Sequence, residues 1–302
     1  MTTDEQPVGG APPVRLAPGL RRVLAPNPSP MTLRGTNTYI VGTGAVAVID
    51  PGPEDERHLA AILAALDPGE RVSHILVTHA HRDHSPLARR LAAVTGAPVL
   101  AFGDAGAGRS ATMRRLAAKG LLGGGEGVDH GFRPDRCLAD GEVVADDGWQ
   151  MEALWTPGHF GNHMCFAWQD TVFTGDLVMG WASSLVSPPD GDLGAFMASL
   201  ERLKTRGAGI FHSGHGDPIT APGERLNWLI AHRREREAQI RAALAKAAAD
   251  AASLARAIYT ETPAALMPAA ERNVLAHLID LTERNLTACA GELTAQSRFR
   301  LR

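Results

Sequence analysis

The chain has 302 residues, of which 44% are hydrophobic, and a formal net charge of −3. This is enough material for a buried core and for one large domain with a small one beside it. The charge gives no general reason to expect a polyanionic partner or an anionic membrane surface. Cys137, Cys165 and Cys289 are far apart and form no C-x-x-C pair, which argues against a disulfide framework.

The start of the chain is rich in Pro and Gly, and residues 1–20 are expected to form a flexible segment. No basic start with a following apolar run is present, so a secretory signal is not expected. No stretch approaches the ~20 apolar residues that cross a bilayer. We therefore expect a cytoplasmic protein without a membrane partner.

Alternating strand and helix patterns predict a layered α/β domain over residues 21–222. Residues 36–41 and 45–50 predict a hairpin, because Gly42-Thr43-Gly44 lies between them. Further strands are expected at residues 73–77, 98–102, 142–145, 150–155, 163–168, 171–174 and 208–211. Apolar residues at helical spacing predict helices that include Leu59, Leu87 and Leu193, and residues 113–122 are a weaker helix candidate.

Residues 223–302 have a different character. Helices are expected at residues 226–249, 254–259 and 268–284, and residues 287–302 alternate weakly, as a short β-hairpin does. Three helices with a terminal hairpin are typical of a winged helix. We therefore expect a small winged-helix-like domain at the C-terminus.

A dense group of ligand-type side chains follows the strand expected at residues 73–77. His79, His81, Asp83 and His84 lie within six residues. Imidazole and carboxylate groups suit zinc and its first-row neighbours. The spacing of His79 and His81 points both side chains the same way in extended backbone, and a turn is expected to aim Asp83 and His84 at a second ion.

Three further candidates, His159, Asp176 and His215, each follow a glycine just beyond an expected strand. Sites in layered α/β folds gather at strand ends, so these loops are expected to converge on the first group. The preceding glycines allow the backbone to pass close beside a ligand.

These motifs, T-H-x-H-x-D-H, G-H, G-D and G-H, occur in this order between Thr78 and His215 and resemble the metal signature of the metallo-β-lactamase superfamily. The resemblance implies a four-layer αβ/βα sandwich with the metals between the edges of its two sheets. It also implies one zinc held by His79, His81 and His159, a second held by Asp83, His84 and His215, and Asp176 as the bridge between them.

Residues 32–39, 156–163 and 190–192 resemble the branch of the superfamily that contains β-lactamase-like protein 2. Members of that branch carry a C-terminal winged helix. Its characterised members are similar to endoribonucleases that act on single-stranded RNA, so the resemblance implies RNA as one candidate substrate.

The expected chemistry is hydrolysis. Two divalent ions ~3.5–4 Å apart share a water and lower its pKa from ~15.7 toward 7. We predict a dinuclear zinc hydrolase, with Mn²⁺ or Fe²⁺ as alternative metals, in which a bridging hydroxide is the nucleophile. Asp83 is expected to orient this hydroxide or to take its proton, in addition to binding metal.

Two other residues near the motifs have candidate roles. His163 is a candidate to protonate the leaving group or to bind an anion, and the alternative is a buried histidine that hydrogen-bonds a metal ligand. Asp50, at another strand end, is expected to orient a metal-binding histidine or to cap the turn.

The sequence leaves the substrate open between single-stranded RNA and a small thioester, lactone or related ester. Residues 225–302 hold 12 Lys and Arg against 8 Asp and Glu, a net charge of +4, and the remainder has −7. This asymmetry has the sign expected for phosphate binding, but Glu235 and Glu237 interrupt the arginines of the long helix, as in a salt-bridged surface helix. A non-enzymatic nucleic-acid-binding protein is a third hypothesis. If the winged helix does not bind nucleic acid, we expect it to shape the active site or to form a homodimer.

Overall fold

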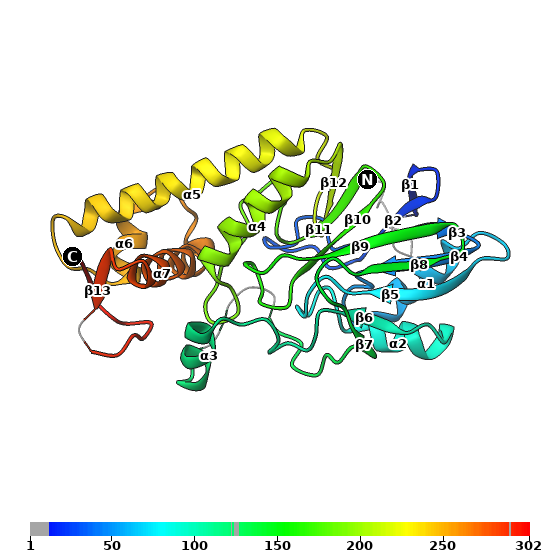
Figure 1. Ribbon diagram of the computed structural model, residues 1–302, viewed down its shortest axis with the longest axis horizontal. Helices are drawn as coiled ribbons and strands as arrows, with labels where there is room; N and C mark the ends of the chain where they lie inside the picture. Colours follow the sequence, from blue (N-terminus) through cyan, green and yellow to red (C-terminus); the bar gives the residue numbers. More distant parts are fainter. Residues whose placement is uncertain (1–11, 122, 124–126, 290) are drawn as a thin grey trace, which may run out of the picture.

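The computed structural model describes residues 12–121, 123, 127–289 and 291–302. Two β-sheets lie against each other, with helices on their outer faces and a helical module at one end (Figure 1). The first sheet contains, in spatial order, β1 (Val14–Ala17), β2 (Leu20–Leu24), β3 (Asn37–Thr43), β4 (Ala45–Ile49), β5 (Arg71–Leu76), β6 (Val99–Ala101) and β7 (Arg136–Cys137).

The second sheet has five strands in the order β12-β11-β10-β9-β8. Their bounds are β8 (Val143–Asp146), β9 (Trp149–Trp155), β10 (Met164–Trp168), β11 (Thr171–Gly175) and β12 (Ile210–Ser213). β12 pairs parallel with β11, whereas β8 to β11 pair antiparallel.

Alternate residues of each strand face opposite sides of its sheet, so each sheet packs on both of its faces. On β4, Ala47 and Ile49 belong to the core between the two sheets, while Val46 and Val48 face the opposite way. That outer face is covered by α1 (Glu56–Ala64) and α2 (Leu87–Thr95). The outer face of the second sheet is covered by α4 (Leu193–Arg206) and by the first half of α5 (Pro222–Leu244). The predicted four-layer αβ/βα sandwich is therefore confirmed.

The C-terminal module contains the second half of α5, α6 (Ala251–Ile258), a short 3₁₀ turn (Ala264–Leu266), α7 (Met267–Glu283) and the hairpin β13 (Thr287–Cys289) and β14 (Phe299–Leu301). These elements share one apolar core. Met113 and Leu116 of α3 (Ala111–Ala118) also enter this core, although α3 precedes every strand of the second sheet in the chain. The expected three helices and terminal hairpin are all present.

Some elements were not predicted from the sequence. β1 is short and largely exposed, β7 has only two residues, and β2 is buried but short and carries two arginines, so none gives a clear strand pattern. β1 lies within the segment expected to be flexible and pairs with β2, while residues 1–11 of that segment lie outside the described residues. Helix α3 ends at Ala118, earlier than expected, and residue 122 of its expected range is also outside the described part. Among the described residues no helix is both long and apolar enough to cross a membrane.

Candidate metal centre

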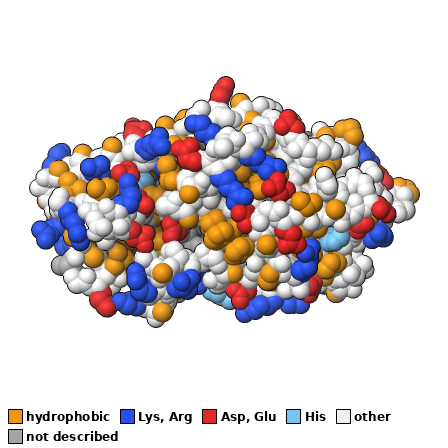
Figure 2. Space-filling view, in the orientation of Figure 1, with side chains coloured by type: hydrophobic (Ala, Val, Ile, Leu, Met, Phe, Trp, Pro, Cys, Tyr) orange, Lys and Arg blue, Asp and Glu red, His pale blue; other side chains and the backbone are white. Residues whose placement is uncertain are grey.

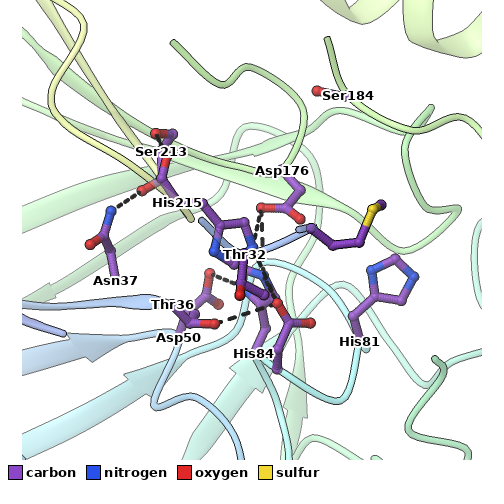
Figure 3. Close-up of polar contacts among 12 residues, drawn as sticks. Thr32, Thr36, Asn37, Asp50, His81, His84, Asp176, Ser184, Ser213 and His215 are labelled. Atoms are coloured by element: carbon purple, nitrogen blue, oxygen red, sulfur yellow. Dashed lines mark hydrogen bonds and ion pairs between the residues drawn. The ribbon is translucent and has the colours of Figure 1, made fainter. Parts of the chain in front are cut away.

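Every predicted ligand lies in a loop at the end of a strand, and the loops come from both sheets. His79, His81, Asp83 and His84 follow β5, and His159 follows β9. Asp176 comes directly after β11, and His215 comes just after β12. In Figure 3 the side chains of His84, Asp176 and His215 point toward one another between the two sheets.

The side chains gather into two groups that share Asp176. Within each group, the candidate ligand atoms all lie within 4.8 Å of one another. One group is His79, His81, His159 and Asp176, and the other is Asp83, His84, Asp176 and His215. All of these residues are buried. The structure therefore brings the whole predicted set together, in the two groups and with the shared aspartate that the resemblance implied.

Hydrogen bonds behind the imidazoles fix which ring nitrogen faces the centre. His159 Nδ1 lies 2.7 Å from the carbonyl oxygen of Leu185, and His215 Nδ1 lies 3.2 Å from that of Gly35. A carbonyl only accepts, so Nδ1 carries a proton in both rings, and Nε2 is the nitrogen that faces the other candidate ligands. Nε2 of His159 lies 3.1 Å from Nδ1 of His81, which in turn lies 2.9 Å from Nε2 of His79.

Asp50 orients the candidate ligands that follow β5, and it lies on the side of them that faces away from the centre. Its carboxylate accepts hydrogen bonds from Thr78 N and Thr78 Oγ1, both at 2.7 Å, and from His84 Nδ1 at 2.9 Å. The hydroxyl of Thr78 donates its hydrogen bond to Asp50, so its oxygen accepts from His79 Nδ1 at 3.0 Å. The predicted orienting role of Asp50 is thus present in the hydrogen-bond geometry.

The remaining polar atoms of the centre fit a bound cation. Nε2 of His84 lies 3.3 Å from Asp83 Oδ2 and 3.5 Å from Asp176 Oδ1, and Nε2 of His215 lies 3.1 and 3.3 Å from the same oxygens. Asp83 Oδ1, His84 Nε2 and Asp176 Oδ1 are buried without a hydrogen-bond partner among the described residues. Buried polar atoms are rarely left unsatisfied, so converging orphan atoms of metal-ligand type indicate a site for metal.

The pKa shifts in the two groups also indicate a site for metal. Burial opposes protonation of His215, but the carboxylates of Asp176 and Asp83 outweigh it and raise its pKa to about 10. The same balance holds the pKa of His84 well above its usual range. In the other group, burial lowers the pKa of His81 to about 3 and lowers the pKa of His79. One group therefore attracts positive charge, and the other keeps its nitrogen lone pairs free.

At two of the glycines that precede candidate ligands, the neighbouring atoms leave no room for a side chain. A Cβ on Gly214 would lie 2.5 Å from Asp176 Oδ1 and 2.6 Å from His84 Cε1. Gly158 has a φ of +151°, and a Cβ there would lie 2.3 Å from the Cα of Phe196. The glycine before His215 thus lets the backbone pass close to the candidate ligands, whereas the glycine before His159 lets the backbone pass close to α4.

A family model described as the metallo-beta-lactamase superfamily matches residues 31–215. The chain belongs to the metallo-β-lactamase superfamily. A second model, for the beta-lactamase associated winged helix domain, matches residues 251–294. The C-terminal module is thus the winged helix that the sequence predicted.

Comparisons with individual proteins agree with this assignment. The chain is 34% identical over 269 residues to an atrochrysone carboxyl ACP thioesterase of Aspergillus fumigatus, which covers 82% of this chain and 76% of the relative. It is 31% identical over 285 residues to a beta-lactamase-like protein 2 homolog of Drosophila melanogaster, covering 88% and 89%. The crystal structure of a metallo-beta-lactamase family protein from Thermus thermophilus matches 95% of this chain and all of its own, with a TM-score of 0.74 and 25% identity. The protein is accordingly a hydrolase of this superfamily, with His and Asp groups that can bind metal.

In this metallo-β-lactamase-fold hydrolase, the two residues predicted to be catalytic lie in different surroundings. Asp83 lies within the centre, where Thr36 Oγ1 donates to its Oδ2 at 3.4 Å and its Oδ1 has no partner in the described structure. His163 is fully buried, with Nδ1 3.0 Å from Thr156 Oγ1 and its ring 5.3 Å from that of His79. Burial holds the pKa of His163 well below its usual value. His163 is thus buried, as its alternative role requires, but its hydrogen bond goes to Thr156 and not to a metal ligand, and its Nε2 has no partner among the described residues. Both roles given for it stay predictions.

Several groups that shape the site gave no signal in the sequence. The carbonyls of Leu185 and Gly35 act through the backbone, so their side chains do not reveal them. Asn37 Nδ2 and Tyr39 Oη both donate to the carbonyl of Ser213, at 3.0 and 2.7 Å, and so hold the loop that carries His215. Both residues lie on the buried strand β3, where the sequence pattern fits packing as readily as a role in the site.

Proposed function

We propose that this protein binds two divalent metal ions, zinc in the first instance, and hydrolyses a thioester of a small acyl group. The two donor groups that share Asp176 support a dinuclear site, and a set of imidazoles and carboxylates suits zinc, with Fe²⁺ or Mn²⁺ as alternatives. When bound, such ions lower the pKa of a coordinated water and polarise the carbonyl oxygen of the substrate.

The chain's own residues contribute positioning and proton acceptance. Asp83 Oδ1, which has no partner among the described residues, is placed to accept a hydrogen bond from the attacking water. Asp83 Oδ2 is held by the hydroxyl of Thr36 at 3.4 Å. A fixed carboxylate of this kind orients a nucleophile without having to reorganise during the reaction.

The choice between the two candidate substrates depends on the contacts that the C-terminal arginines already make. Arg225, Arg233 and Arg272 of α5 and α7 donate to backbone carbonyls in the catalytic domain. Three others form ion pairs, namely Arg234 with Glu201, and Arg241 and Arg284 with Glu237. Figure 2 shows basic and acidic side chains interspersed over the end that holds this module. Binding to a phosphate backbone would require these arginines to exchange their present hydrogen bonds and ion pairs, which favours a small acyl substrate over RNA.

The name of one relative supports the thioester. The Aspergillus fumigatus protein, at 34% identity, is named as a thioesterase of an acyl carrier protein. Single-stranded RNA remains the second candidate, because residues 225–302 carry a net charge of +4 and the sequence resembles the β-lactamase-like protein 2 branch. The compartment and a possible homodimer remain predictions from the sequence.

A single substrate panel tests the proposal. Zinc-loaded protein is assayed with an acyl thioester of a pantetheine thiol, a lactone, a simple ester and labelled single-stranded RNA, each with and without chelator. Thioester turnover that chelator abolishes and zinc restores, without RNA cleavage, is the expected result. RNA cleavage without thioester turnover would overturn the proposed substrate, and tight RNA binding without any turnover would favour a non-enzymatic role.

A further inference from the structure

The loop between Asp176 and α4 is held from one side by the C-terminal helices. Arg225 of α5 donates to the carbonyls of Met179 and Ala182, at 2.7 and 2.6 Å. Arg272 of α7 donates to the carbonyl of Pro188 at 3.4 Å. The segment that follows the shared aspartate is therefore fixed at several points by residues outside the catalytic domain.

A linked set of these contacts surrounds Leu185. Arg233 of α5 donates through one Nη to the carbonyl of Ser184 and through the other to Asn273 Oδ1 of α7, the latter at 3.0 Å. The same Oδ1 of Asn273 accepts from the backbone N–H of Val186 at 3.0 Å. Both neighbours of Leu185 are thus fixed by this arginine–asparagine pair.

Leu185 in turn fixes a candidate metal ligand, because its carbonyl accepts from His159 Nδ1 at 2.7 Å. Arg233 is only 2% exposed, and no carboxylate pairs with it among the described residues. A buried charge is costly unless hydrogen bonds compensate it. Its guanidinium lies 5.1 Å from the ring centroid of Phe196 on α4, which offsets part of that cost.

We propose that Arg233 and Asn273 are positioning residues for the metal centre, acting through the carbonyl of Leu185 on His159. The winged-helix module thereby sets the affinity of the His79, His81 and His159 group for its ion. This inference rests on the proposed metal-dependent function. Groups that hydrogen-bond a metal-binding histidine typically change metal affinity ~10–100-fold when they are removed, and the lower end of this range is expected for residues that act one contact further out.

The test compares Arg233→Met with Arg234→Met in the full-length protein. Arg234 is the next residue of α5 and forms an exposed ion pair with Glu201, so its variant removes an equal charge without touching the loop. Metal-free protein is titrated with Co²⁺, and stoichiometry, affinity and the visible absorption of the bound ion are recorded alongside the unfolding temperature.

Arg233→Met is expected to keep one tight ion and to bind the other ~10-fold or more weakly, with an altered Co²⁺ spectrum, while Arg234→Met binds as the parent does. A lower unfolding temperature with both affinities and the spectrum unchanged would overturn the inference, because it would show a merely structural role.

A second pair of variants covers the case in which Arg233→Met does not fold. Asn273→Leu removes the shared acceptor and is expected to weaken the same ion, whereas Asn273→Asp keeps the acceptor oxygen and is expected to restore binding. Equal Co²⁺ affinity of Asn273→Leu and the parent would contradict the inference. If the parent itself binds no metal, the proposed function fails; if the parent binds two ions and no variant differs from it, the positioning role alone fails.

Discussion

Nδ1 of His84 lies 2.9 Å from Oδ2 of Asp50, at the far side of the imidazole from the metal centre. This contact keeps the proton on Nδ1 and directs Nε2 toward Asp83 and Asp176. The same carboxylate holds Thr78, the residue just before His79. One buried side chain therefore sets the orientation of ligands in both groups.

Replacement of Asp50 by Asn is expected to weaken metal binding ~10–100-fold, because the amide nitrogen can donate to His84 and reverse its tautomer. Asn is the suitable substitution because Asp50 has a φ of +49°, a conformation that Asn tolerates. Titration with zinc against a competing chelator measures the change. Unaltered affinity would show that Asp50 serves only the turn.

Replacement of Asp176 by Ala is expected to reduce hydrolysis at least ~100-fold while leaving a folded protein. Asp176 belongs to both donor groups, so its loss removes a ligand from each. Turnover, metal content and circular dichroism are measured together. Near-normal turnover in a variant that retains its metal would contradict the proposed mechanism.

Replacement of Gly214 by Ala is expected to lower metal affinity ~10-fold or more, because the added Cβ would lie 2.5 Å from Asp176 Oδ1 and displace it. Gly223→Ala is the matched control, since a Cβ at that position meets no atom within 4 Å. Zinc affinity is measured for both proteins. If the two variants bind zinc equally well, the requirement for glycine before His215 is refuted.

The buried imidazole of His277 is expected to make stability depend on pH. Burial, together with the charge of Arg233, lowers its pKa to about 3, whereas the unfolded chain has the usual value of about 6.5. Between these values the unfolded state binds the proton and the folded state does not. The contribution of His277 to the free energy of unfolding is therefore complete above about pH 6.5. It is lost as the pH falls toward 3, by up to ~1.4 kcal/mol per pH unit.

Denaturant unfolding of the parent and of His277→Leu from pH 4 to pH 8 checks this expectation. The difference between the two proteins cancels the contributions of other histidines. The variant is expected to lose less stability than the parent on acidification. Parallel pH profiles would show that His277 does not titrate differently in the folded and unfolded states.

The sequence predicted the metal centre more completely than it predicted the fold. Ligands such as His159 and His215 carry their chemistry in the side chain, and each follows a glycine that marks a close turn of the backbone. The packing of α3 into the C-terminal core could not be foreseen, because Met113 and Leu116 show only that the helix has an apolar face, not what covers it. The pair of Arg233 and Asn273 was equally hidden, because its acceptors and donors are main-chain groups of a loop.

The long helix α5 belongs to both apolar cores. Leu226, Leu229 and Ile230 near its start pack on the second sheet, whereas Ile240 and Leu244 near its end pack with α6 and α7. A truncation at residue 222 would thus uncover apolar surface on the catalytic domain as well as remove the appended module. We therefore expect the truncated protein to be less soluble than the full chain, and the two parts of the full chain to unfold in one cooperative transition.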